Sequence, residues 1–338
     1  MPLPRRELID AAVERYMSQI KTESTAELQA QARTLSAAVF AGLPIDNTVS
    51  SLTIVPDGSL HRVPFAALYD RDGNLVLEKR SVSYAPSGKV LTALRRMTDH
   101  SANSMFAVGA VQYNEVSRFA VWNEFAKTFR GLSTLNRDQL LPLPGTAEEL
   151  KTIKVLFGDK VITMSGSEAT ESQFKRTVAA RPFSVIHLAV HAFADRNYPD
   201  RAGMLFAPES KVGEKDGNDG ILQLPEIRDL PLQRTTLVTL SACNTNVGRT
   251  EGEEGLSSIV QSFLYAGAKS AVATLWMTED MSTSALMKRF YQHLATGEST
   301  REALRESQLE MIHGGGDWRL PFYWAAFTLN GDGSRTAP

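Results

Sequence analysis

The sequence has only one cysteine, Cys243, among its 338 residues. A single cysteine allows neither an internal disulfide nor a cysteine-based zinc site, so we expect a reducing, cytoplasmic compartment and neither a metal nor another cofactor. Long hydrophobic runs are absent as well, since no apolar stretch has the roughly 20 residues that a membrane-spanning helix needs. The first residues alternate charged and apolar side chains, unlike the continuous apolar core of a secretory signal. We therefore expect no membrane association.

An excess of charge of one sign is also absent. The chain has 36 Lys and Arg residues against 38 Asp and Glu residues, a formal net charge of −2. Proteins that bind nucleic acid directly usually carry a strongly basic surface, so the composition gives no reason to expect such binding. With 43% hydrophobic and 22% charged residues, the composition is typical of a globular protein with one large or two modest domains.

The single cysteine lies in the most informative stretch of the chain. Residues 237–240, Leu-Val-Thr-Leu, have the apolar, β-branched character of a strand that is buried on both faces. Two small residues, Ser241 and Ala242, separate this run from Cys243. A polar, glycine-containing loop and a helix predicted over about 256–265 come after the cysteine. The cysteine is thus expected at the carboxyl end of a parallel strand, where open α/β sheets gather ligands and catalytic groups.

A histidine follows a second predicted strand of the same kind. Residues 184–190 form an apolar run that ends at His191, 52 positions before Cys243. In caspases the catalytic histidine precedes the cysteine by about 50 residues. A thiol is nucleophilic as its thiolate, and a neighbouring histidine can take the proton. The two positions therefore predict a Cys/His catalytic pair.

The hydrophobic periodicity divides the chain into three regions. Residues 1–46 show helical spacing and form an N-terminal helical segment. Residues 47–138 form a smaller α/β subdomain. Residues 139–333 alternate strand and helix regularly, which predicts a mostly parallel sheet with helices on both faces. The turn-rich residues 131–144 are expected to link the last two regions.

The same patterns give the element boundaries. Strands are predicted at 51–55, 60–65, 75–78, 82–84, 105–111, 160–164, 184–190, 203–207, 237–240, 270–276 and 322–329. Helices are predicted at 7–20, 26–40, 87–97, 146–157, 169–180, 224–230, 256–265, 281–295 and 300–312, the last with Ser299 as its N-cap.

Several of these segments resemble the CHAT domain, a caspase-like cysteine protease group related to separase and often found behind tetratricopeptide arrays. The most specific pieces are HLAVHAFAD and LVTLSACNTNVG, which contain His191 and Cys243. The likeness extends over about 50–332 and implies a caspase–hemoglobinase fold in which a pseudo-protease-like subdomain precedes the active one. It also implies a protein substrate, a regulatory protein or helical-repeat module as partner, and a catalytic dyad whose imidazole is oriented by backbone.

The resemblance implies a cysteine endopeptidase. Cys243 would attack the scissile carbonyl, and His191 would protonate the leaving amine. Backbone N–H groups of Cys243 and Ala192 would bind the oxyanion, an interaction worth about 2.7–4 kcal/mol per donor. Two positions depart from the family pattern: Ala192 replaces a usual Gly, and Asn244 replaces a commonly acidic residue. Ala192 keeps its N–H but adds a methyl group close to the substrate path.

The substrate pocket is expected between the segments that follow Cys243 and the strand at 270–276. The acidic and aromatic residues of these segments are Glu251, Glu253, Glu254, Trp276, Glu279 and Asp280, with Asn244 beside the nucleophile. A carboxylate pairs well with a guanidinium, so cleavage after Arg or Lys is favoured. Alternatively Asp280 caps the helix at 281–295 and leaves an apolar pocket, and the glutamates form a solvated loop.

A second hypothesis is a non-catalytic CHAT-type scaffold that binds partners and retains a vestigial dyad. Ala192 is the feature that favours it. His187, four residues before His191 on the same strand, is predicted to be a buried, hydrogen-bonded residue with no part in catalysis.

Overall fold

The computed structural model describes residues 4–20, 25–40, 43, 45–46, 48–97, 104–113, 143–193, 202–208, 218–241, 253–276 and 278–334. Among the predicted site residues, Cys243, Asn244 and Glu251 lie outside these ranges. His191, Ala192, Trp276, Glu279 and Asp280 lie inside them.

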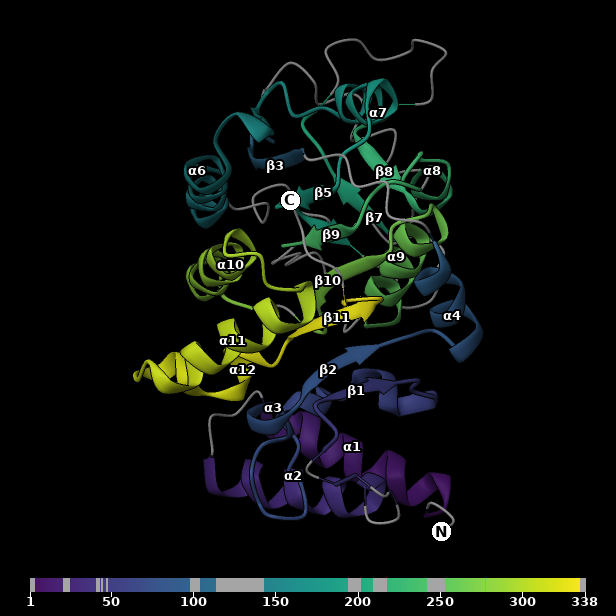
Figure 1. Ribbon diagram of the computed structural model, residues 1–338, viewed down its shortest axis with the longest axis vertical. Coiled ribbons are helices and arrows are strands. Elements are labelled where there is room, and N and C mark those ends of the chain that lie inside the picture. The colour runs from purple at the N-terminus through teal and green to yellow at the C-terminus, as the bar shows by residue number, and fades with distance from the viewer. Residues whose placement is uncertain are drawn as a thin grey trace.

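One eight-stranded sheet runs through the molecule in the order β1-β2-β11-β10-β9-β5-β3-β4 (Figure 1). Its neighbouring strands pair in parallel, except β10 with β11, which pair antiparallel. The sheet confirms the predicted mostly parallel α/β fold. The strands are β1 (Ser51–Ile54), β2 (Ser81–Tyr84), β3 (Met105–Val111), β4 (Val161–Gly166), β5 (Val185–Leu188), β9 (Leu237–Leu240), β10 (Ser270–Thr274) and β11 (Phe327–Gly331).

Helices cover both faces of this sheet. Successive side chains of a strand point to opposite faces, and the core follows that alternation: Val185 packs into one apolar cluster and Ile186 into the other. The first face carries α6 (Pro144–Phe157), α10 (Asp280–Ala295) and α11 (Thr300–His313). The second carries α7 (Glu171–Ala180), α8 (Leu224–Arg228) and α9 (Glu253–Tyr265).

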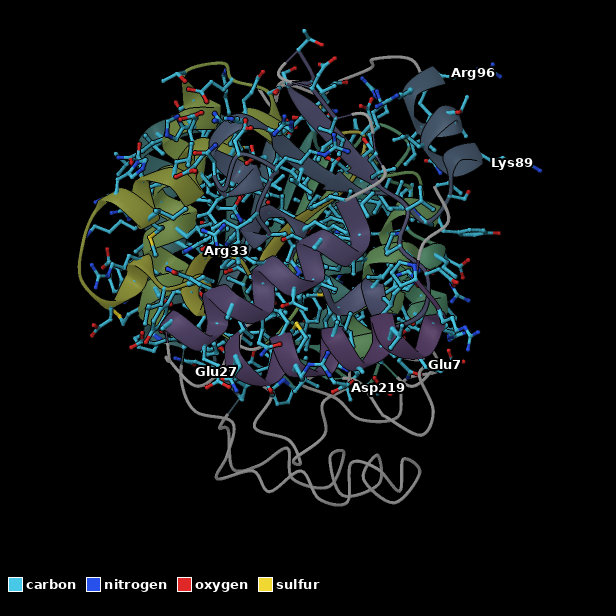
Figure 2. The ribbon with its side chains drawn as sticks, turned by 90° about the horizontal axis from the view of Figure 1, so that it is seen from below. Glu7, Glu27, Arg33, Lys89, Arg96 and Asp219 are labelled. Atoms are coloured by element: carbon cyan, nitrogen blue, oxygen red, sulfur yellow. The ribbon has the colours of Figure 1, made fainter. Side chains whose placement is uncertain are left out.

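The N-terminal helices α1 (Arg6–Ile20) and α2 (Thr25–Phe40) pack together below β1. Figure 2 looks at that end of the molecule and shows both helices lying across it, with Glu7 and Glu27 at the surface. Their inner side chains, such as Val13 and Leu35, belong to the same apolar cluster as the first face of the sheet. The helical segment is therefore continuous with the main core.

The predicted division at 138/139 runs through a single sheet. β1 and β2 extend it beyond β11, and β3 lies between β5 and β4. Strands from both predicted subdomains thus share one hydrogen-bonded ladder.

A second sheet of three short antiparallel strands continues from the end of β5. It comprises β6 (Ala192–Phe193), β7 (Gly203–Leu205) and β8 (Ile221–Gln223). The sequence patterns predicted only β7, as part of a longer apolar run at 203–207. β6 and β8, of two and three residues, are too short to show periodicity by themselves.

Three predicted strands are wrong in part or entirely. Residues 60–65 lie in the 3₁₀ helix η1 (Gly58–Arg62), a two-residue connection and the first residue of the 3₁₀ helix η2 (Phe65–Ala67). Residues 75–78 lie largely in the short helix α3 (Val76–Lys79). The Glu78 carboxylate accepts the backbone N–H of Leu75 at 2.9 Å, which closes the first turn of α3. The predicted strand 322–329 begins as the helix α12 (Pro321–Trp324), where proline occupies the first helical position.

The remaining short elements are α4 (Gly88–Arg96), η6 (Gly158–Lys160) and η8 (Asp317–Arg319). None of the helices in the described ranges has the length and apolar character needed to cross a membrane.

Candidate active site

His191 lies at the junction of the two sheets, three positions beyond the end of β5 and directly before β6. The residue is fully buried. Its backbone carbonyl accepts the N–H of Leu205 at 2.7 Å. Its own N–H donates to the hydroxyl oxygen of Tyr113 at 3.2 Å. Two hydrogen bonds, one on each side of the residue, therefore fix the backbone that carries the imidazole.

Tyr113 follows β3 and is buried against His191. The two rings lie 5.0 Å apart between centroids with an interplanar angle of 48°. The Tyr113 hydroxyl also donates to the carbonyl oxygen of Leu205 over 3.4 Å. Burial raises the pKa of this phenol above its ordinary value, so the hydroxyl keeps its proton and can donate and accept at once. The sequence patterns missed Tyr113, because 78 residues separate it from His191 and no spacing links them.

The ends of β5 and β9 lie side by side. Leu188 pairs with Leu240, and the N–H of Ser241 donates to the carbonyl of Leu188 at 3.0 Å. Cys243 follows Ser241 by two positions in the sequence. Both Cys243 and Asn244 lie outside the described residues, so their predicted roles stay predictions.

Ala192 is the first residue of β6 and pairs with Met204 of β7. Its methyl group is buried in the apolar cluster of the second face. The methyl group that replaces the usual glycine hydrogen therefore packs into the core.

The predicted pocket residues beyond β10 have different surroundings. Trp276 is buried, and its indole N–H donates to the carbonyl of Phe322 at 3.0 Å. Glu279 is exposed and precedes α10 without a side-chain capping bond. Asp280 begins α10, and its Oδ2 accepts the backbone N–H of Gly145 at 2.6 Å. The Asp280 carboxylate therefore caps the start of α6, and not the start of α10 as the alternative prediction had it.

His187 is a buried structural residue, as predicted. Its Nδ1 lies 2.9 Å from the hydroxyl of Tyr291, which also donates to Thr239 Oγ1 at 3.0 Å. Its Nε2 lies 3.1 Å from the buried carboxylate of Glu149, although this contact lacks hydrogen-bonding geometry. The cluster joins β5, β9, α6 and α10 on the first face of the sheet.

A second polar cluster holds the small sheet against α7. The buried carboxylate of Glu171 accepts the N–H groups of Asp219 and Gly220 at 3.0 and 2.9 Å, and it pairs with Lys175. Lys175 also pairs with Glu226 of α8. Burial raises the pKa of Glu171, and it raises the pKa of Asp219 to about 6. The described residues contain no group of three or more His, Cys, Asp or Glu side chains placed to hold a metal ion.

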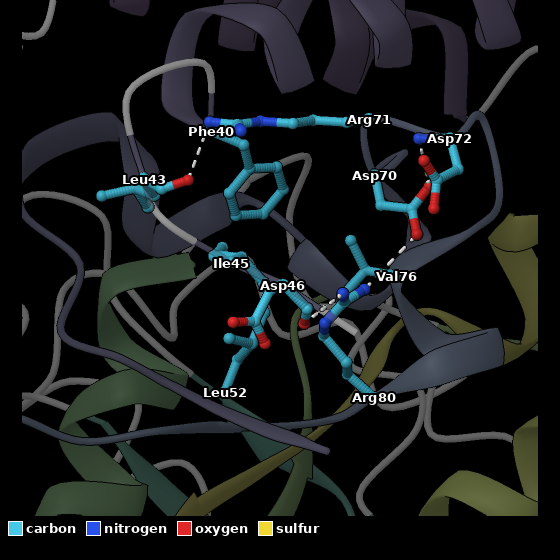
Figure 3. Close-up of a pocket in the computed structure, with 10 residues that line it drawn as sticks. All are labelled: Phe40, Leu43, Ile45, Asp46, Leu52, Asp70, Arg71, Asp72, Val76 and Arg80. Atoms are coloured by element: carbon cyan, nitrogen blue, oxygen red, sulfur yellow. Dashed lines mark hydrogen bonds and ion pairs between the residues drawn. The ribbon is translucent and has the colours of Figure 1, made fainter. Parts of the chain in front are cut away.

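A cavity of about 280 Å³ lies at the N-terminal end, beside β1 and five strands away from β5 (Figure 3). Its charged groups largely bond within the protein: Arg80 donates to Asp70 and to the carbonyl of Asp46, and Arg71 donates to the carbonyl of Leu43. Nothing in this arrangement identifies a ligand. The cavity is lined by Phe40, Leu43, Ile45, Asp46, Leu52, Asp70, Arg71, Asp72, Val76 and Arg80.

Comparison with known proteins agrees with this fold. A family model of the CHAT domain matches residues 19–332. Tetratricopeptide repeat protein 28 of Mus musculus is 24% identical over 306 residues, and its Homo sapiens counterpart is 24% identical over 313 residues. Each match covers 83% of this chain but 12% of the relative, so the chain spans about an eighth of the length of these proteins.

Solved structures show the same architecture at low identity. The Arg-specific cysteine proteinase gingipain R aligns with a TM-score of 0.53 and 9% identity, covering 98% of this chain and 74% of that chain. The complex of Porphyromonas gingivalis RgpB pro- and mature domains aligns at 0.50 and 9%, covering 99% and 78%. At such identity the likeness establishes the fold alone, and that fold is caspase-like.

Proposed function

Because this chain belongs to the CHAT domain family and has a caspase-like fold, we propose that it is a cysteine endopeptidase that cleaves a partner protein with Cys243 and His191. The observation that carries the proposal is the position of His191. It is fixed just beyond the carboxyl end of β5, beside the end of β9, and Cys243 follows β9 within three residues. Adjacent parallel strand ends are where an α/β sheet places catalytic groups.

In the first half of the proposed reaction, the thiol proton moves twice. His191 takes the thiol proton of Cys243, and the thiolate attacks the scissile carbonyl to form a tetrahedral oxyanion. His191 then gives that proton to the leaving amine, which leaves a thioester between Cys243 and the substrate. His191 then takes a proton from water, the hydroxide attacks the thioester and the C–S bond breaks. The carboxylic acid product leaves, and the proton returns from His191 to the Cys243 thiolate. Backbone N–H groups of Cys243 and Ala192 are the proposed donors to the oxyanion.

The burial of His191 supports regulation by another protein. A fully buried imidazole cannot contact a peptide substrate until the residues around it move aside. The binding free energy of a partner that prefers the open form can supply that shift. The curated relatives are named for tetratricopeptide repeats and are far longer than this chain, so the proposed regulator is a helical-repeat module, attached or separate.

Cleavage after a basic residue is the proposed specificity. Asp280 already bonds to Gly145, so the exposed Glu279 and the acidic residues Glu251, Glu253 and Glu254 are the candidates to pair with an Arg side chain. Gingipain R is named for Arg specificity, and the proposal extends that preference to this chain.

A non-catalytic scaffold is the second candidate function. The complete burial of His191 favours it too, because a vestigial dyad needs no access to substrate. In that case the fold binds partner proteins, and Cys243 has the reactivity of an ordinary thiol.

A thiol-reactive peptide probe separates the two functions. Because the chain has one cysteine, all labelling occurs at Cys243, and Cys243→Ala gives the background. We expect wild type to react with an Arg-containing probe in the presence of its regulator, and His191→Ala to lose the reaction. His61→Ala, which replaces a histidine in η1, is the matched control and should react like wild type. Equal labelling of wild type and His191→Ala would instead support the scaffold.

A further inference from the structure

The chain reaches Tyr113 through an irregular end of β3. β3 pairs in parallel with β5 up to Val108 and Leu188, and its register with β4 shifts between Val108 and Val111. Ala110, inside this bulge, has φ of 50°, a left-handed conformation that few residues other than glycine adopt. Its N–H donates to Thr146 Oγ1 at 2.9 Å. A bulge re-aims the residues that follow it and often lies beside a functional site.

Close packing holds the bulge in place. A Cβ atom at Gly109 would come within 2.6 Å of Leu150 Cδ1 and 3.3 Å of the Ala189 methyl group. Ala189, two residues before His191, donates its N–H to the carbonyl of Val108 at 2.8 Å. The segments that lead to Tyr113 and to His191 are thus hydrogen-bonded and closely packed where they leave the sheet.

Tyr113, His191 and Leu205 form a closed set of contacts. The Tyr113 hydroxyl accepts the His191 N–H and donates to the Leu205 carbonyl, while the Leu205 N–H donates to the His191 carbonyl. The phenol ring packs against the imidazole. The hydroxyl therefore bridges two backbones, and the ring touches the side chain that does the chemistry.

We propose that Tyr113 is the positioning residue for His191, holding its backbone by the hydroxyl and its imidazole by the ring. The inference rests on the proposed peptidase function and supplies the orienting group that the sequence did not reveal. The face of an aromatic ring attracts a cation, so the ring stabilises the imidazolium that forms when Cys243 gives up its proton. Phenylalanine at this position keeps the ring but cannot bridge the two backbones.

The chain offers a matched control in Tyr84. Its hydroxyl accepts the N–H of Phe65 at 2.8 Å and donates to the carbonyl of Val63 at 2.9 Å, and it is buried like that of Tyr113. It lies on β2, three strands away from β9. Tyr84→Phe therefore removes a similar backbone bridge and should cost similar stability, without contact with His191.

The test compares the wild-type chain with Tyr113→Phe, Tyr113→Leu and Tyr84→Phe. The measurements are kcat and KM for peptide cleavage, the rate of Cys243 alkylation by iodoacetamide against pH, and the melting temperature. We expect Tyr113→Phe to lower kcat by about two- to tenfold with little change in KM, the size of one lost hydrogen bond. Tyr113→Leu should also narrow the pH range in which Cys243 is alkylated quickly. Without the ring the imidazolium loses its proton at a lower pH, so fast alkylation should end at a lower pH. Tyr84→Phe should change only the melting temperature.

The outcomes keep the two proposals apart. If wild-type alkylation depends on His191 but Tyr113→Phe behaves like Tyr84→Phe, the positioning role is overturned and the peptidase proposal stands. If wild-type alkylation is indifferent to His191, both are overturned. If Tyr113→Leu does not fold, the comparison of the two Phe variants decides alone.

Discussion

The carboxylate of Asp280, at the start of α10, accepts the backbone N–H of Gly145 near the start of α6 at 2.6 Å. Ser284, one turn further along α10, donates its hydroxyl to the carbonyl of the same glycine at 3.2 Å. The space beside Gly145 is filled by Asp280, since a Cβ atom there would lie 2.8 Å from its carboxylate. Asp280 and Ser284 thus join α10 to α6, two of the helices that cover the first face of the sheet.

The first prediction concerns this joint. Asp280→Ala should lower the free energy of unfolding by about 1–2 kcal/mol, because the start of α6 loses its capping acceptor. Asp280→Asn retains an amide oxygen that can accept the bond and should lose less. Urea denaturation measures both. An alanine variant as stable as wild type would contradict the capping role.

Asp280→Asn, compared with Glu279→Gln, also addresses substrate choice. If Glu279 and the acidic residues near 251–254 form the basic-specific pocket, Asp280→Asn should leave a preference for Arg unchanged, whereas Glu279→Gln should weaken it. A fluorogenic peptide library varied at the residue before the cut provides the measurement. Preference for Leu or Met in wild type would rule out the basic pocket altogether.

The second prediction concerns His187 and Glu149. His187→Leu removes the imidazole that lies 3.1 Å from the buried Glu149 carboxylate, and it should cost about 3–5 kcal/mol of folding free energy. The double variant with Glu149→Leu should be more stable than His187→Leu alone, because no buried charge remains. Urea unfolding of both single variants and of the double variant tests this, and additive losses would argue against the coupling.

The third prediction is a pH dependence of stability. Burial, reinforced by Glu226, raises the pKa of the Asp219 carboxyl to about 6 in the folded protein, against about 3.9 for an unperturbed aspartate. Between these pH values the folded state holds a proton that the unfolded state has lost. The free energy of unfolding should therefore fall as pH rises from about 4 to 6. Above that range Asp219 should cause no further change with pH.

Asp219→Asn should remove this part of the slope, because an amide does not titrate and its oxygen can still accept the N–H of Ile221. Melting temperatures of wild type and variant, recorded from pH 4 to 7.5, isolate Asp219 from Glu171, whose pKa burial also raises. Asp159→Asn, at an exposed position, is the control. Parallel curves for wild type and Asp219→Asn would refute the assignment.

The fourth prediction concerns the proposed dyad. Cys243→Ala should abolish peptide cleavage, and His191→Ala should lower it by about 10³-fold or more, because residues of a catalytic unit fail together. The hydrogen bonds of the His191 N–H and carbonyl belong to its backbone and are retained in His191→Ala, so this variant should still fold. Cleavage assays with circular dichroism melts test this, and near wild-type turnover in either folded variant would disprove the dyad.

Local physical signals in the sequence were enough to predict most of the regular elements. The apolar runs at β5 and β9 predicted strands buried on both faces, and both are buried throughout. Ser299 was predicted to begin a helix, and its hydroxyl accepts the N–H of Glu302 at the start of α11. Such signals are readable because the residues that produce them are neighbours in the chain.

Other features follow from contacts between distant segments. The sequence patterns did not predict that Tyr113 lies against His191, 78 residues later, or that Asp280 caps a helix 135 residues earlier. Segment 75–78 has the apolar content of a strand, but packing and the Glu78 cap make most of it a helix. The sequence alone thus determined which segments are strands or helices wherever neighbouring residues repeat a pattern. Only the tertiary structure decided which side chains meet, because strand order and register bring them together and no local pattern records either.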